Sequence, residues 1–95
     1  MAIQMTREMG LSHREFLRTL PRALEGRGYQ RDGNTIVIDE PPRRLTIHLA
    51  CEEKRQIALL QLPVTRVTFA FSGYTEAETD AFMQRFTRYF QRGGG

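Results

Sequence analysis

The sequence has few of the residues that build disulfide frameworks and metal sites. Its 95 residues include one Cys, two His and no Trp. A single Cys excludes an internal disulfide framework and a Cys-rich zinc site. The unpaired thiol also fits a reducing compartment, so we expect a cytoplasmic protein. The length excludes a TIM barrel, which needs about 250 residues, and any cleft between two domains.

Long apolar runs are missing as well. The longest run, residues 57–60, is far shorter than the roughly 20 residues that cross a bilayer. The first ten residues contain Arg7 and Glu8 where a secretory signal would need an apolar segment. The sequence therefore predicts neither a membrane span nor a signal peptide.

Charge of one sign is only slightly in excess. The 14 basic residues, of which only Lys54 is Lys, and 11 acidic residues leave a net charge of +3. Arg recurs every three or four residues along two expected helices, which places it along one side of each. These stripes are candidate polyanion sites, and a solvated helix face is the alternative interpretation. No recognition motif accompanies them, so a nucleic acid partner is not expected. The stripe residues are Arg14, Arg18, Arg22, Arg85, Arg88 and Arg92.

Apolar residues are sufficient for one core. They make up 40% of the chain and include six Phe, which predicts a single folded domain over residues 1–92. Residues 93–95 are all Gly and are expected to form a flexible tail.

Two helices begin at clear capping signals. Ser12 with Glu15, and Thr75 with Glu78, each have the spacing of a capping box. Apolar residues follow both caps at helical spacing, and the series Phe82, Phe86 and Phe90 is expected to pack on strand residues 67–71. Pro21 interrupts the first pattern and predicts a kink or restart there.

The remaining segments indicate strands. Residues 2–9, 29–31, 34–38, 45–51, 57–62 and 67–72 alternate or are rich in apolar residues, and Asp32-Gly33 predicts a hairpin. Residues 52–55 are expected to form a charged turn. The predicted fold is α+β in the order β-α-β-β-β-β-α: a two-layer domain with a mostly antiparallel sheet of about five strands and both helices on one face.

No catalytic constellation is visible. Cys51 shares the predicted strand face of Leu45, Ile47 and Leu49, so we expect a buried and unreactive thiol. His48 lies three residues away and therefore on the opposite face, where it cannot share a metal ion with Cys51. We expect no enzyme activity, no catalytic residues, no metal and no cofactor.

The sheet face left open by the helices carries unusual residues. A solvated face would favour Lys, Glu and Arg, yet the outward positions are small or weakly polar, and residues 57–62 must place apolar side chains there on either of their two faces. Such a patch is typical of a contact surface. We therefore expect an interaction module that forms a homodimer through this face, with His48 making association sensitive to pH. The alternative is a module that binds a polyanion or small ligand on this face or the Arg stripes. The interface candidates are His48, Ala50, Leu60, Leu62, Thr68 and Ala70.

Overall fold

The chain folds into two layers, a sheet and a pair of helices. The computed structural model describes the backbone of residues 2–93 and the side chains of residues 2–91. Residues 94 and 95 of the expected glycine tail lie outside the described residues. The elements are β1 (Ala2–Met9), α1 (His13–Ala23), β2 (Gln30–Asp32), β3 (Thr35–Glu40), β4 (Arg43–Leu49), β5 (Glu53–Ile57), β6 (Leu60–Ser72) and α2 (Glu76–Gly93).

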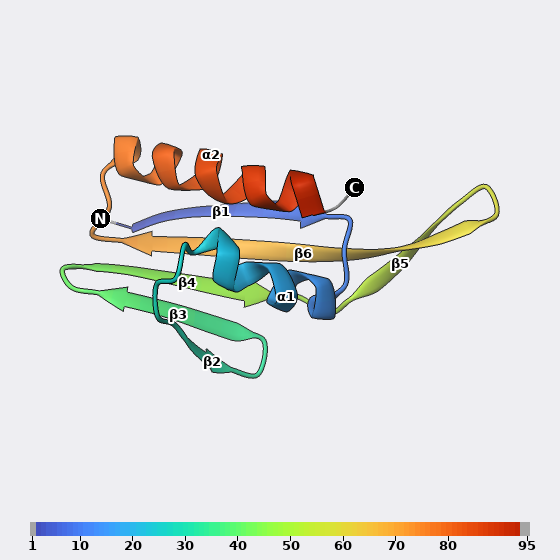
Figure 1. Cartoon of the computed structure of the whole chain (residues 1–95), viewed down its shortest axis with the longest axis horizontal. Helices are drawn as coiled ribbons and strands as arrows, with labels where there is room; N and C mark the ends of the chain where they lie inside the picture. Colours follow the sequence, from blue (N-terminus) through green and yellow to red (C-terminus); the bar gives the residue numbers. More distant parts are fainter. Residues whose placement is uncertain (1, 94–95) are drawn as a thin grey trace.

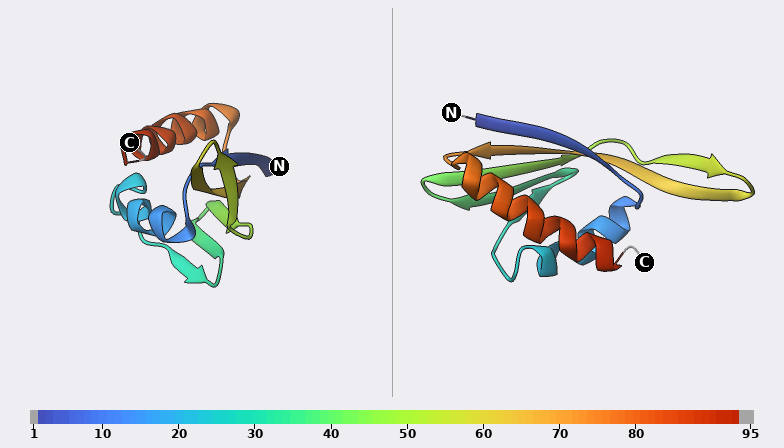
Figure 2. Two further views of the ribbon diagram at one scale, coloured as in Figure 1. Left: turned by 90° about the vertical axis from the view of Figure 1, so that its right-hand side faces the viewer. Right: turned by 90° about the horizontal axis from the view of Figure 1, so that it is seen from above.

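The sheet is antiparallel throughout and has the order β1-β6-β4-β3-β2, with β5 paired to one end of β6. Both helices lie against the same face of this sheet (Figures 1 and 2). The predicted α+β class, antiparallel sheet and one-sided helices are therefore confirmed. The sheet has six strands in the described chain, where about five were expected.

The core lies between the helices and the odd-numbered residues of β4 and β6, together with Ile36 and Ile38 of β3. Leu45 and Ile47 of β4 and Phe69 of β6 are buried, whereas the residues between them face the other way and are half-buried or exposed. The aromatic series of α2 closes this layer as expected. Phe86 contacts Phe69, with ring centroids 5.4 Å apart, and Phe90 stacks on Phe16 of α1 at 5.1 Å.

Two local expectations need correction. Residues 57–62 are not one strand, because a turn at Ala58 and Leu59 separates β5 from β6, and Ala58 has a φ of 55°. The expected charged turn over residues 52–55 is largely strand β5 instead. Pro63 lies within β6, where its nitrogen points to the side at which β1 has already ended, and a strand edge tolerates the missing donor.

Cys51 is exposed, contrary to the expectation that it is buried. Leu49 pairs with Val67 and Glu53 with Val64, so three residues of the β4–β5 connection face two residues of β6. This bulge breaks the alternation of side chains after Leu49. The residues that follow, including Cys51, therefore no longer alternate between the core and solvent. The helix α1 does not restart at Pro21, because it continues past this residue to Ala23.

Both capping boxes form. At α1, Ser12 N–H donates to Glu15 Oε1 and Glu15 N–H donates to Ser12 Oγ, at 3.0 and 3.1 Å. At α2, Thr75 N–H donates to Glu78 Oε1 at 2.8 Å and Glu78 N–H donates to Thr75 Oγ1 at 3.1 Å. The hydrogen bond from the Thr75 backbone lowers the pKa of the Glu78 carboxyl, and the nearby Arg43 guanidinium adds to this effect.

The cap of α2 should make stability depend on pH. A lowered native pKa means that the ionised Glu78 stabilises the folded state above the ordinary carboxyl range, and this contribution is lost as pH falls through the lowered pKa. Glu78→Gln keeps an acceptor for Thr75 but does not titrate. We expect urea unfolding midpoints of the variant to fall less between neutral and acidic pH than those of the unmodified protein. An equal fall in the urea midpoint for both proteins would contradict the stabilising role of the ionised Glu78.

Candidate functional site

A two-stranded arm projects from the end of the sheet. We define the arm as residues 53–64, which comprise β5 and the first part of β6. Within β6, residues 65–72 pair with β1 and residues 67–72 with β4, whereas residues 60–64 pair with β5 alone. The arm extends past the helices (Figures 1 and 2), and the molecule measures 47 × 25 × 24 Å along its principal axes. A two-stranded ribbon without further packing is marginally stable in water.

The arm is where apolar side chains meet solvent. Five large apolar side chains are exposed in the described chain, and four of them belong to the arm: Ile57, Leu59, Leu60 and Leu62. Leu59 at the turn is 97% exposed and Leu60 is 64% exposed. Ile57 pairs with Leu60 and Arg55 with Leu62, which places three of the four apolar side chains on one face of the arm beside Arg55, here called its apolar face. Gln56 and Gln61 pair on the opposite face.

The apolar face of the arm is continuous with the sheet face that the helices leave open, here called the open face. Alternation along β6 places Leu60 and Leu62 on the same side as Thr68 and Ala70. An ion pair marks the junction, since Arg55 Nη2 of the arm lies 2.7 Å from Glu8 Oε1 of β1. The two surfaces therefore form one extended face.

Small side chains occupy the middle of the open face. The strand registers align Thr6, Thr68, His48 and Thr35 in one row, and Gln4, Ala70, Thr46 and Val37 in the next. Thr35 Oγ1 and His48 Nδ1 are 3.2 Å apart, and the hydroxyls of Thr6 and Thr68 are 3.3 Å apart. The polar side chains of the first row thus form hydrogen bonds with one another in two pairs.

Two ion pairs form within the chain on this face, whereas Arg66 of β6 is exposed there and has no carboxylate within 4.0 Å among the described side chains. Arg44 Nη2 donates to Asp39 Oδ2 at 2.8 Å, and this hydrogen bond raises the pKa of Arg44. Arg55 and Glu8 form the second pair. A surface that approaches the open face therefore meets neutralised pairs at these positions.

The structure brings together most of the interface residues expected from sequence. Thr68 and Ala70 are half-buried on the open face and His48 is exposed there. Leu60 and Leu62 lie on the arm. Ala50 is the exception, because it lies in the bulge, where its N–H donates to the Arg66 carbonyl and its own carbonyl lies 2.7 Å from His13 Nε2.

Ile57 and Leu59 were expected on the open face only as the alternative to Leu60 and Leu62, whereas all four are exposed on the arm. Ile57 and Leu59 belong to the site only because the chain turns at Ala58, and no Gly, Pro, Asn or Asp marks that turn. Glu52 was likewise expected in a solvated turn, but its Oε1 accepts the backbone N–H of His13 at 2.8 Å, which fixes the bulge to the start of α1.

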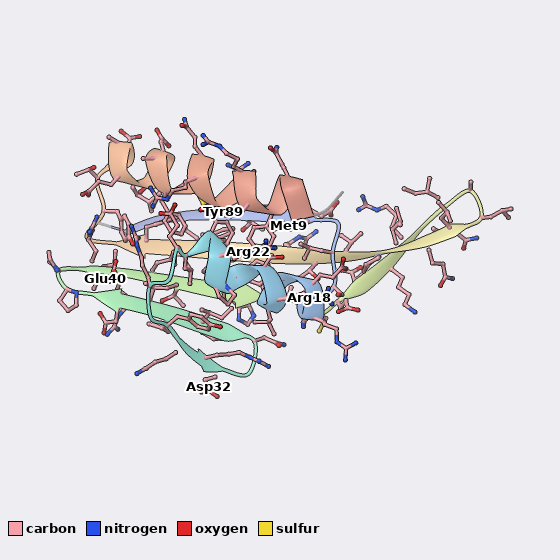
Figure 3. All side chains as sticks on the ribbon, in the orientation of Figure 1. Met9, Arg18, Arg22, Asp32, Glu40 and Tyr89 are labelled. Atoms are coloured by element: carbon pink, nitrogen blue, oxygen red, sulfur yellow. The ribbon has the colours of Figure 1, made fainter. Side chains whose placement is uncertain are left out.

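The Arg stripes do not form one basic surface. Arg14, Arg18 and Arg22 are exposed on α1 and have no carboxylate within 4.0 Å among the described side chains; Figure 3 shows two of them. On α2, Arg85 Nε instead lies 3.1 Å from Glu25 Oε1. Arg88 is exposed, and the side chain of Arg92 lies outside the described residues. Within the described side chains, only the α1 stripe is a row of three exposed Arg residues.

No group of three or more potential metal ligands occurs in the part of the chain that the structure describes. Within the same residues, no helix has the length and apolar character needed to cross a membrane. Comparison with known proteins found no matching family model, no matching curated protein and no matching solved structure.

Proposed function

We propose that this chain is a small non-enzymatic interaction module that self-associates, with the arm of each copy lying on the open face of the other. The observation that carries the proposal is the gathering of four exposed apolar side chains on an arm whose two strands pair only with each other. A second copy supplies what the arm lacks, which is a surface that covers its apolar face.

The lengths of the two surfaces support a reciprocal contact. At about 3.3 Å per residue, the five β6 residues of the arm span roughly 16 Å and the eight residues 65–72 of the body span roughly 26 Å. Each arm therefore fits within the partner's open face when two copies lie antiparallel. Such a contact has twofold symmetry, the commonest arrangement in soluble oligomers.

Shape and charge support the same arrangement. The large side chains of the arm would meet small ones such as Thr46 and Ala70, which permit close approach. Full burial of one Leu contributes about 1.5–3 kcal/mol, and symmetry doubles each contribution. A stable interface needs roughly 800 Å² per partner, which requires the arm and the open face together. The ion pairs of Arg44 and Arg55 limit the charge that must be desolvated.

The test is molar mass by light scattering with two matched variants. Leu60→Lys places a charge in the proposed contact, whereas Gln61→Lys places the same charge on the opposite face of the arm. We expect the unmodified chain and Gln61→Lys to be dimers and Leu60→Lys to be a monomer, because burial of an unpaired charge costs several kcal/mol. A monomeric unmodified chain at about 100 µM, far above the dissociation constant of a stable dimer, would refute the proposal.

A variant of the open face separates this contact from an arm-to-arm contact. Ala70→Glu adds a charge to the open face and leaves the arm unchanged. Arm-on-face association predicts dissociation by Ala70→Glu as well as by Leu60→Lys. A dimer that survives Ala70→Glu would show that the arms pair with each other instead.

A further inference from the structure

β1 is a terminal strand with a free edge over its whole length. It pairs with β6 on one side, and no described strand lies on the other. Ala50 N–H donates to the Arg66 carbonyl, so the even-numbered residues of β6 direct their backbone groups toward β4. The odd-numbered residues of β6 then bond to the odd-numbered residues of β1. The backbone groups of Gln4, Thr6 and Glu8 consequently point outward and are available to another strand.

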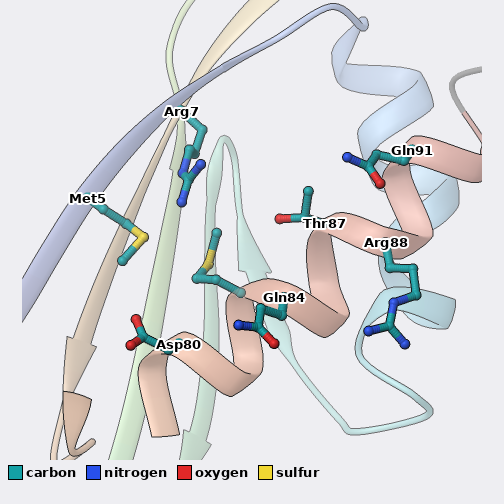
Figure 4. A pocket seen from close by; sticks show the side chains of 8 residues that line it. Met5, Arg7, Asp80, Gln84, Thr87, Arg88 and Gln91 are labelled. Carbon is teal, nitrogen blue, oxygen red and sulfur yellow. The ribbon is translucent and has the colours of Figure 1, made fainter. Parts of the chain in front are cut away.

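A groove runs along this edge between β1 and α2. Its volume is about 560 Å³, which is within the range of ligand sites. Figure 4 shows Met5 and Arg7 of β1 directed toward the space beside α2. The residues that line the groove include Met5, Arg7, Asp80 and Met83.

Arg7 is an unusual residue at its position. The other helix-facing residues of β1, namely Ile3, Met5 and Met9, are partly buried against the core. Arg7 is exposed among them and has no carboxylate within 4.0 Å in the described chain. An inward-pointing charge on an edge strand opposes pairing with an ordinary apolar strand. The same charge favours a strand that presents a carboxylate opposite to it.

We propose that the β1 edge and the β1–α2 groove bind an extended acidic peptide by strand addition. The peptide runs antiparallel to β1, which is the more stable pairing, and places a Glu or Asp opposite Arg7. Arg7 directs its own backbone groups toward β6, so this pair belongs to the closer, non-hydrogen-bonded kind. Two residues later the peptide meets Met5, where Met83 favours an aliphatic side chain and the carboxylate of Asp80 disfavours a second acidic one.

The β1 strand of a second copy does not match the site. The helix-facing residues of β1 are Ile3, Met5, Arg7 and Met9, so a β1–β1 pair presents no carboxylate to Arg7. Glu8, the acidic residue of this strand, points toward the open face. Pairing of two β1 strands is therefore not the proposed contact, and the site is separate from the arm and the open face through which we propose self-association.

The experiment is fluorescence anisotropy with labelled eight-residue peptides that alternate Thr and Val. One peptide carries Glu at its fourth position, and the matched peptides carry Gln or Lys there. We expect the Glu peptide to bind about fivefold more tightly than the Gln peptide, because a cross-strand ion pair contributes up to about 1 kcal/mol. Arg7→Glu should reverse the order of the Glu and Lys peptides, whereas Arg14→Glu, the same charge change on α1, should leave it unchanged.

A backbone variant tests strand addition itself. Gln4→Pro removes an outward N–H and leaves the hydrogen bonds between β1 and β6 in place. We expect Gln4→Pro to weaken the binding of every peptide, whereas Gln4→Thr should retain binding. Three results would each overturn the proposal. The first is equal affinity for the Glu and Gln peptides, and the second is no binding of either peptide at about 1 mM. The third is unchanged peptide binding by a folded Gln4→Pro variant. A dissociation constant of about 1 mM is the weakest binding that the proposal allows for such a short peptide.

Discussion

Replacement of Phe86 by Ala is expected to destabilise the domain by about 3–5 kcal/mol. The Phe86 side chain is 1% exposed and lies where α2 meets both α1 and the sheet. Its ring centroid lies 5.4 Å from that of Phe69 in β6, 4.8 Å from that of Phe90 and 6.2 Å from that of Phe16 in α1. Truncation therefore leaves a cavity bordered by three elements, which cannot close without moving a helix.

Urea unfolding at one fixed protein concentration measures this loss, because self-association would link stability to concentration. A domain of this size has a total stability of roughly 5–15 kcal/mol, so the midpoint should fall substantially. Gln84→Ala is the matched control on the same helix, since Gln84 is exposed and its loss should change stability by no more than about 0.5 kcal/mol. Equal midpoints for Phe86→Ala and Gln84→Ala would show that Phe86 does not hold the layers together.

The helices could be predicted from sequence because their signals are local. A capping box and an apolar period each depend on residues within a few positions of one another. Ser12 and Glu15 bond as their spacing predicts, and Phe82, Phe86 and Phe90 point into the core. The hairpin between β2 and β3 is likewise local, although its two-residue loop is Gly33-Asn34, one residue later than expected.

The arm could not be located from sequence because its residues have no buried side. A strand is recognised by alternation between core and solvent, and all residues of β5 are exposed. The bulge before β5 has the same origin. It is defined by the pairing of Glu53 with Val64 in a distant part of the chain, and local sequence around Cys51 gives no sign of it.

The two candidate surfaces also differ in how far local sequence predicts them. The open face could be expected from small residues such as Thr68 and Ala70 at alternate positions of β6, because alternation is a local property. The β1–α2 groove depends on the position of the C-terminal helix beside the N-terminal strand, which is set by the insertion of β6 between β1 and β4. Arg7 consequently had no role in the sequence interpretation beyond excluding a signal peptide.

Gly73→Ala is expected to cost about 3 kcal/mol or more, through backbone strain and a collision together. Gly73 follows β6 with a φ of 79°, a conformation that costs other L-residues about 1–2 kcal/mol. A Cβ at this position would also collide with the carbonyl oxygen of Pro42 in the loop between β3 and β4. Relief of the collision must move that loop or the link to α2, and either shift disturbs the layer that holds Phe82.

Gly33→Ala separates the two contributions. Gly33 has a φ of 62°, and a Cβ added there would have no atom within 4 Å. We therefore expect Gly33→Ala to lose only the conformational part, about 1–2 kcal/mol, measured by the same urea titration. The difference between the two losses of unfolding free energy measures the cost of the close approach of Gly73 to the β3–β4 loop. If both variants lose the same free energy, the contact between Gly73 and Pro42 does not constrain the fold, and the return of the chain from β6 to α2 depends on the φ of Gly73 alone.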